Sequence, residues 1–203
     1  MDGGGDHPLN LVYALAKKIR TGAFAGFRAW KERGFAHLAI VVRDSLATEV
    51  ENALHPYLRD RLVGRLDVAV SASQDTIRGA ALDLEVHLDR ARQAELVEKL
   101  REAISTDRRG VAGLAESLQA LAEHRASQLL VSKGFSSPGW RCDSCQVRLL
   151  VGRRCKHCGT EMVKLDDVVE DAVQDALAQS CEVEVCENPD LDVLGRIGAL
   201  LRF

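Results

Sequence analysis

The chain has 203 residues, which is enough for one large domain or two small ones, and 46% of them are hydrophobic, enough to build packed cores. Its 27 basic and 30 acidic residues give a formal net charge of -3, so any contact with nucleic acid must depend on local patches. No run approaches the roughly 18 apolar residues of a membrane span, and the first residues lack a secretion signal, so the sequence predicts a cytoplasmic protein with no membrane contact.

The first 33 residues comprise a leader and a basic segment. Residues 1–8 are rich in Gly and Asp without any periodicity and are predicted to be disordered. From residue 9 to 33 apolar residues recur at three- and four-residue spacing, which predicts an amphipathic helix, or two short ones broken near Gly22. A solvated polar face is one interpretation of its charges, and contact with RNA phosphates or a partner is the other. The candidate residues are Lys17, Lys18, Arg20, Arg28, Lys31 and Arg33.

Two short apolar runs follow, HLAIVV at residues 37–42 and LDVAV at residues 66–70. Both are predicted to be buried strands, with helical sequence between them. Ser73 is then a candidate N-cap for a long helix from about residue 74 to residue 104. A helix of this length is typical of a connection between two domains.

The second half of the chain alternates helices and strands around a cysteine-rich insertion. The apolar periodicity predicts helices at residues 111–123 and 165–179 and strands at 127–131 and 181–186, with the insertion at 140–162. This order of elements is typical of an α/β protein.

Four cysteines form two CxxC pairs that are nine residues apart, namely Cys142, Cys145, Cys155 and Cys158. Each turn can direct two thiolates at one ion, and a β-hairpin would bring the pairs together, so the spacing predicts a structural Zn²⁺ site of the zinc-ribbon type. A redox CxxC is the competing interpretation, but it requires one reactive pair near the start of a helix. Catalytic zinc is not expected, because four thiolates leave no coordination position for water.

The surroundings of the ribbon suggest further roles. Arg153 and Arg154 are candidates for contact with RNA or with a protein partner, and Trp140 is expected to pack beneath the ribbon. Cys181 and Cys186 are expected to be packing residues of a strand. The sequence contains no P-loop, no dinucleotide-binding glycine motif and no nucleophile in a recognisable setting, so we do not expect an enzyme.

Several segments together resemble the class-1 peptide chain release factors of the archaeal and eukaryotic type, and in particular their bacterial branch. The C-terminal resemblance rests on the double CxxC ribbon, DDVVEDAV at residues 166–173, CEVEVC at 181–186 and GRIGALLRF at 195–203. In the last run Arg196 stands where the family has a glycine. HLAIVV, LHPYLRDRLVGRL at residues 54–66 and the segment at 109–135 resemble the bacterial branch.

The resemblance implies that residues 9–87 are the back half of the family's ribonuclease-H-like middle domain. Residues 88–203 would be the last domain, an α/β/α sandwich similar to kink-turn-binding ribosomal proteins, with the zinc ribbon inserted. The implied role is in translation termination and protein biosynthesis, with the ribosome or rRNA and a translational GTPase as partners. Gly195, Ile197 and Gly198 become candidates for partner contact. A half domain would expose a sheet edge, which would favour pairing of two copies.

The leading hypothesis is a release-factor-like, ribosome-associated protein that acts by binding. Family members that release peptides carry a Gly-Gly-Gln tripeptide, which this sequence lacks, so peptidyl-tRNA hydrolysis is not expected. A ribosome-rescue factor of the Pelota type is the first alternative. A ribonuclease-H-like nuclease or another hydrolase is the second; it would need clustered carboxylates for Mg²⁺, for which Asp44, Asp67 and Asp75 are the candidates.

Overall fold

The computed structural model describes residues 21–26, 28, 31–32, 37–69, 71–107 and 109–203. The chain divides into two compact units, Met1–Val86 and His87–Phe203, and the long helix α4 (Gln74–Glu102) runs through the division. This division lies beside the domain boundary expected between residues 87 and 88. Within the described ranges, no helix combines the length and the apolar character needed to span a membrane.

The first unit is built on a small parallel sheet, in which β1 (Leu38–Ile40) pairs with β2 (Leu62–Arg65). Between them in the chain lie α2 (Asp44–Ala53) and α3 (Pro56–Arg59). Pro56 has no backbone N–H, but N–H groups in the first turn of a helix have no partner within it, so α3 loses no hydrogen bond. Nδ1 of His55 accepts a hydrogen bond from the backbone N–H of Tyr57 at 3.4 Å. His55 is therefore a capping residue.

The strand predicted at residues 66–70 is wrong, because the second strand of this unit ends at Arg65. Strand β1 is only three residues long and stops at Ile40. The backbone N–H of Leu66 still donates to the carbonyl of Ile40, at 2.9 Å, and beyond Leu66 the neighbouring strand offers no further partner. Residues 66–69 of LDVAV, which the structure describes, therefore lie outside any strand.

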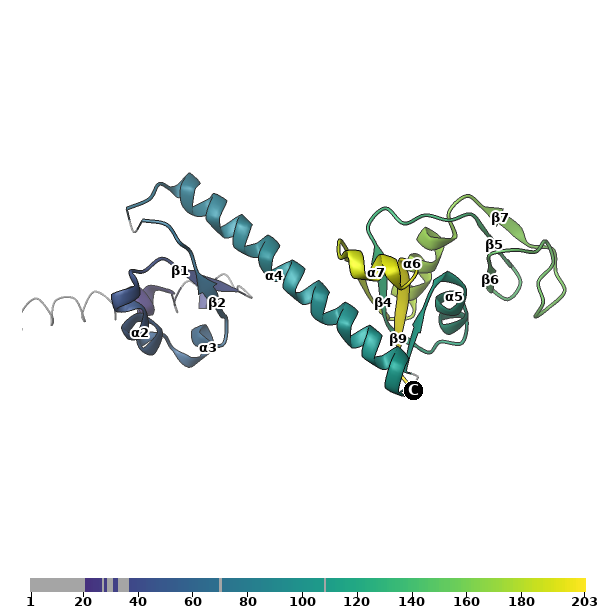
Figure 1. Ribbon diagram of the computed structural model, residues 1–203, viewed down its shortest axis with the longest axis horizontal. Helices are drawn as coiled ribbons and strands as arrows, with labels where there is room; N and C mark the ends of the chain where they lie inside the picture. Colours follow the sequence, from purple (N-terminus) through teal and green to yellow (C-terminus); the bar gives the residue numbers. More distant parts are fainter. Residues whose placement is uncertain (1–20, 27, 29–30, 33–36, 70, 108) are drawn as a thin grey trace, which may run out of the picture. The chain divides into compact units, whose positions relative to one another are not determined.

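The second unit contains a mixed four-stranded sheet in the order β3-β9-β4-β8. Its strands are β3 (Gly110–Ala112), β4 (Ala126–Ser132), β8 (Glu182–Cys186) and β9 (Ile197–Leu201). β4 and β8 are parallel, whereas β9 runs antiparallel to both of its neighbours, β3 and β4. Neither β3 nor β9 was predicted from the sequence. The terminal run consequently forms an inner strand of the sheet, beside β4 (Figure 1).

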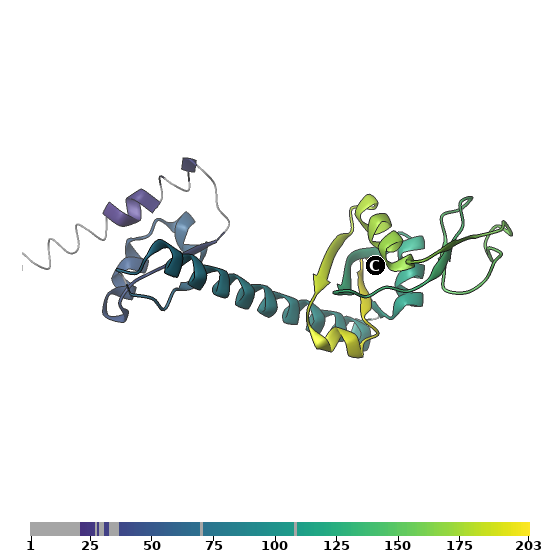
Figure 2. The same cartoon turned by 90° about the horizontal axis from the view of Figure 1, so that it is seen from above.

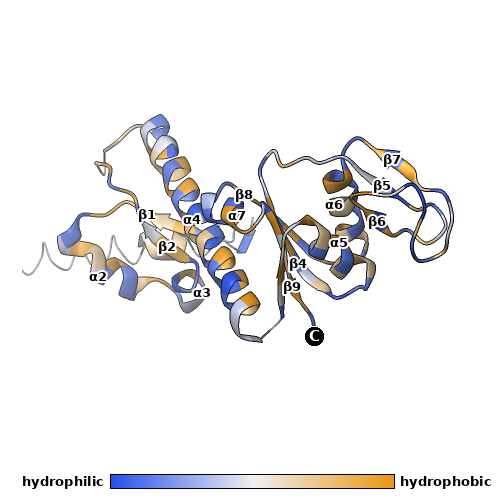
Figure 3. Ribbon diagram, turned by 45° about the vertical axis from the view of Figure 1, so that its right-hand side comes forward, coloured by the Kyte–Doolittle hydropathy of each residue, from blue (hydrophilic) through white to orange (hydrophobic). Residues whose placement is uncertain are grey.

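Helices cover both faces of this sheet. α5 (Leu114–Ala122) and α6 (Val168–Ala178) pack on one face, against Leu129 and Ile197. The C-terminal part of α4 and the short α7 (Pro189–Val193) pack on the other, against Leu130 and Leu200. Side chains of β4 and β9 point alternately to the two faces of the sheet, so each strand contributes to both cores. Most residues of the two strands are hydrophobic, as the colours of Figure 3 show. The predicted α/β class is confirmed.

Two predicted helices begin later than expected. The helix predicted from residue 111 begins at Leu114, because Val111 belongs to β3 and Gly113 turns the chain with a φ of 89°. The helix predicted from residue 165 begins at Val168, where the Asp167 carboxylate caps it by accepting from the backbone N–H of Val169 at 2.9 Å.

In the C-terminal run GRIGALLRF, residues 195–203, most residues of β9 are required for packing. Ile197 and Gly198 are buried in β9. A Cβ on Gly198 would lie 2.6 Å from a methyl carbon of Leu100 and 2.8 Å from the carbonyl oxygen of Val111, so only glycine fits there. This burial argues against direct partner contact by Ile197 and Gly198. Gly195 is exposed, with a φ of 93° that favours glycine.

The edge strand β8 is covered in part by side chains of α4. Gln93 bridges its backbone: the amide nitrogen donates to the carbonyl of Val185 at 3.4 Å, and the amide oxygen accepts from the N–H of Glu187 at 2.9 Å. Arg92 pairs with Glu184 at 2.7 Å. These contacts occupy edge groups of β8 that pairing with a further strand would need. The pairing of two copies was expected at the sheet edge of the half domain, residues 9–87, and no finding supports it.

Replacing Gly198 by alanine should destabilise the second unit. The added methyl group would overlap Leu100 and the Val111 carbonyl, and overpacking of this kind costs about 1–3 kcal/mol. Gly79→Ala in α4 is the matched control, because nothing lies within 4 Å of its Cβ position, and this change should leave stability equal or raise it by about 0.5–1 kcal/mol. Urea denaturation followed by circular dichroism measures both. Equal stability of the two variants would contradict the close packing of β9.

Candidate metal centre

The sulfur atoms of Cys142, Cys145, Cys155 and Cys158 all lie within 4.8 Å of one another. The sulfurs of Cys142 and Cys158 are 3.4 Å apart, as are those of Cys145 and Cys155. Four sulfurs placed about 2.3 Å from a central zinc ion would be about 3.8 Å apart, so the cluster has the size that a zinc site requires. Elsewhere in the described part of the chain, no three His, Cys, Asp or Glu residues gather in this way.

Two turns of the same geometry create the cluster. In the first, the N–H of Cys142 donates to the carbonyl of Val147 and its carbonyl accepts from Gln146; in the second, Cys155 makes the equivalent bonds with Thr160 and Gly159. Gln146 and Gly159 occupy corresponding positions and both have a positive φ, 61° and 74°. Glycine adopts this conformation without strain in the second turn. In the first turn the side chain of Gln146 donates to the carbonyl of Asp143 at 3.0 Å.

Hydrogen bonds to the sulfur atoms favour the thiolate form at the second turn. The hydroxyl and backbone N–H of Thr160 lower the pKa of Cys158 to about 6. The pKa of Cys155 is also lowered, chiefly by the backbone N–H of Cys158. At Cys145 the N–H of Val147 has the same effect, but burial and the neighbouring thiols outweigh it and raise the pKa to about 12. N–H groups directed at sulfur suit ligands that bind a cation as thiolates.

The ribbon that carries these turns is a three-stranded sheet in the order β6-β5-β7. Its strands are β5 (Gly139–Arg141), β6 (Arg148–Leu149) and β7 (Val163–Leu165). A small core of Cys142, Cys155 and Met162 is buried beneath it, with Trp140 packed alongside as expected. Figures 1 and 2 show the ribbon projecting from the sheet and helices of the second unit.

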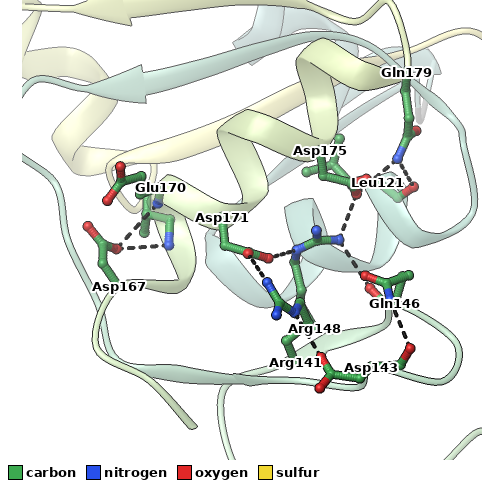
Figure 4. Close-up of polar contacts among 11 residues, drawn as sticks. Leu121, Arg141, Asp143, Gln146, Arg148, Asp167, Glu170, Asp171, Asp175 and Gln179 are labelled. Atoms are coloured by element: carbon green, nitrogen blue, oxygen red, sulfur yellow. Dashed lines mark hydrogen bonds and ion pairs between the residues drawn. The ribbon is translucent and has the colours of Figure 1, made fainter. Parts of the chain in front are cut away.

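Two arginines of the ribbon are held by carboxylates of α6 (Figure 4). Arg148 is 9% exposed and forms ion pairs with Asp171 and, at 2.7 Å, with Asp175. Arg141 pairs with Asp171 at 2.8 Å, which together with the exposed Asp143 raises the pKa of its guanidinium. Partly buried pairs of this kind fix orientation, because a group left without its partner would be an uncompensated charge away from water.

Close backbone packing reinforces this attachment. A Cβ on Gly139 would lie 2.6 Å from the Cβ of Val168, so β5 sits directly against the first turn of α6. The N–H of Val168 donates to the carbonyl of Ser137 at 2.8 Å. The ribbon is therefore joined to α6 by ion pairs, by a hydrogen bond and by packing.

The other predicted site residues do not join the cysteine cluster. Arg153 and Arg154 are exposed in the loop between the two cysteine pairs. Arg28 and Lys31 are exposed and helical, and Arg28 pairs with Glu32 at 3.7 Å. Lys17, Lys18, Arg20 and Arg33, like the leader at residues 1–8, lie outside the described residues.

Asp171 and Asp175 were not singled out from the sequence. They lie four residues apart on α6, so they face the same side of the helix, and this spacing is the only signal that could have identified them. Cys181 and Cys186 are buried and lie away from the cluster, as expected of packing residues. Burial raises the pKa of both thiols, that of Cys186 to about 11.

No protein-family model matches the chain, and no curated protein matches it. Among solved structures, ribosome-bound archaeal Pelota with ABCE1 matches with a TM-score of 0.56 and 16% identity, covering 92% of this chain and 49% of Pelota. Dom34 from S. cerevisiae, described as a translation termination-like factor interacting with Hbs1, matches with a TM-score of 0.56 and 10% identity, covering 92% of this chain and 53% of Dom34. The chain thus spans about half the length of these proteins.

The C-terminal domain of a peptide chain release factor from Methanosarcina mazei also matches, with a TM-score of 0.46 and 18% identity, covering 68% of this chain and 97% of that domain. The Pelota and Dom34 matches show that the chain shares the fold of about half of each of these proteins. The resemblance to the release-factor family is therefore confirmed for the fold.

Asp171→Ala should destabilise the second unit and loosen the ribbon. It removes the carboxylate shared by Arg141 and Arg148, and since the Asp171 side chain is only 14% exposed we expect a loss of about 2–3 kcal/mol. Asp143→Ala is the matched control; this carboxylate also pairs with Arg141 but is 62% exposed, so its loss should cost less than about 0.5 kcal/mol. Thermal unfolding compares the two, and similar losses would contradict the anchoring role of Asp171.

Proposed function

We propose that this chain is a release-factor-like protein of the translation machinery that acts by binding to the ribosome. The observation that carries this proposal is the fold shared with ribosome-bound archaeal Pelota over 92% of the chain. The segments of the sequence that resemble the class-1 release factors support it independently, because they were identified from residues and not from the fold. The chain is proposed to bind without catalysing a reaction.

The four cysteines are proposed to hold a structural zinc ion. Their number, their mutual distances and the N–H groups directed at their sulfurs support this assignment. With four protein ligands the ion would have no open position for substrate, so it would hold the two turns together and perform no chemistry. The cysteines would thus fix the shape of the loop between them.

A finer assignment of the two units follows the same resemblance. The parallel pair β1 and β2 with its helices is proposed to be part of a ribonuclease-H-like domain. The second unit, with helices on both faces of a mixed sheet, is proposed to be similar to kink-turn-binding ribosomal proteins. A translational GTPase is the protein partner that the family resemblance implies.

A Pelota-like role in ribosome rescue is the second candidate function. It is favoured by the matches to Pelota and Dom34, both of which have a TM-score of 0.56. The nuclease alternative has less support. Asp44 pairs with Arg65, Asp75 lies near Arg78, and Asp67 does not join them in a metal-sized group among the described residues.

Purified protein should contain about one zinc ion per chain, as a four-cysteine structural site does. Cys142→Ser should lose most of this zinc, because one of the four sulfur ligands is removed. Cys181→Ala, which changes a buried cysteine outside the cluster, should retain it. Elemental analysis by mass spectrometry measures the metal. Wild-type protein without zinc, or equal zinc loss in the two variants, would exclude the site.

The chain should pellet with purified bacterial ribosomes through a sucrose cushion at low salt. Vacant ribosomes and ribosomes with a filled decoding site should be compared, since a rescue factor would prefer the vacant ones. With either kind of ribosome, more protein should be found in the pellet than in a control without ribosomes. An absence of ribosome-dependent pelleting under every condition would overturn the proposed function.

A further inference from the structure

The ribbon contains two kinds of basic residue, and the difference points to a binding surface. Arg141 and Arg148 lie at its base, and their charges are compensated by Asp143, Asp171 and Asp175. Arg153 and Arg154 lie in the loop between the cysteine pairs, Lys156 lies within the second pair, and all three are exposed. Within the residues that the structure describes, no carboxylate lies within ion-pair distance of these three.

Neither Glu161 nor Glu123 forms an ion pair with these cations. Glu161 faces Arg154 across an isolated bridge of the backbone, yet their side chains form no ion pair. Lys156 lines a groove of about 570 Å³ between the ribbon and α5, where Glu123 is the acid. Glu123 is already paired with Arg125 at 3.0 Å and accepts from Gln119 at 2.8 Å. Three cations within four residues therefore remain available to an external anion.

The zinc ion and four thiolates proposed above would carry a net charge of -2, but at the centre of the ribbon. Cys142 and Cys155 are buried, Cys145 is half-buried and Cys158 is exposed, and N–H groups of the turns are directed at the sulfurs. The three cations belong to the segment between β6 and β7, which Figures 1 and 2 show reaching beyond the helices of the second unit. A partner that binds this segment of the ribbon would therefore contact exposed, positively charged side chains.

The composition of the loop favours RNA over a protein. A protein interface draws most of its affinity from aromatic or aliphatic anchors buried in pockets. In the loop between the cysteine pairs the exposed apolar side chain is Val151, which is followed by a glycine at residue 152. An RNA backbone presents one phosphate per nucleotide and needs only correctly placed cations, with arginine preferred for bidentate contact.

We propose that Arg153, Arg154 and Lys156 form a phosphate-binding surface for ribosomal RNA, held in place by the cysteine cluster and by the ion pairs of Arg148. This inference rests on the proposed ribosome association and assigns that association to one surface. The contact is to the RNA backbone, so it is independent of RNA sequence and strongly dependent on salt.

The test compares the triple variant R153Q/R154Q/K156Q with the matched control R78Q/R90Q/K99Q, which removes three exposed cations from α4. Fluorescence anisotropy measures binding to purified rRNA from 50 to 300 mM salt, and pelleting measures binding to ribosomes. The loop variant should lose about tenfold or more in RNA affinity, and its salt slope should fall by about 2, whereas the control should match wild type. Zinc content and circular dichroism verify that each variant is folded.

The outcomes separate this inference from the proposed function. Unchanged rRNA binding by the loop variant, or an equal loss in the control, overturns the phosphate-binding surface even if wild-type protein pellets with ribosomes. Reduced ribosome pelleting with unchanged rRNA binding also overturns it, in favour of a protein contact. Loop-dependent rRNA binding without any ribosome pelleting supports the surface and contradicts the proposed function.

Discussion

The second unit depends on the placement of β9 between β3 and β4. This strand connects a three-residue strand on one side with the longest strand on the other, and its side chains enter the cores on both faces of the sheet. Gly198 lets Leu100 of α4 approach the strand closely. Arg202 then donates to the carbonyls of Ala126 and Gln179, both at 3.0 Å, which ties the strand to the elements around it. Because the ribbon is inserted between β4 and α6, it is positioned only when this sheet is complete.

The ribbon combines two separate stabilising devices. Inside it, two equivalent turns direct four sulfurs at one point, and this arrangement is local in sequence. Outside it, Arg141 and Arg148 reach α6, at Asp171 and Asp175. The first device holds the loop together and the second holds the ribbon against the domain. Their combination presents exposed cations on a fixed support, which lowers the entropy lost when a ligand binds.

The features predicted most accurately from the sequence are those that depend on residues close together in the chain. The cysteine spacing predicted a cluster, and the long periodic pattern predicted α4 within about two residues at each end. Strand pairing between segments that are far apart in the chain could not be predicted from the sequence. The strand character of residues 197–201 depends on β3 and β4, and the false strand at 66–70 fails because β1 is short. Likewise the ion pairs of Arg148 could not be predicted from its neighbours, because its partners on α6 are 23 and 27 residues away in the chain.

The chain shares the fold of about half of Pelota and of Dom34, and we propose that it binds the ribosome. The most direct test is an electron cryomicroscopy reconstruction of the chain mixed with bacterial ribosomes. The account predicts density for the second unit on the ribosome, with the loop between the cysteine pairs lying against the rRNA backbone. Ribosomes without added density, at protein concentrations that saturate pelleting controls, would contradict it.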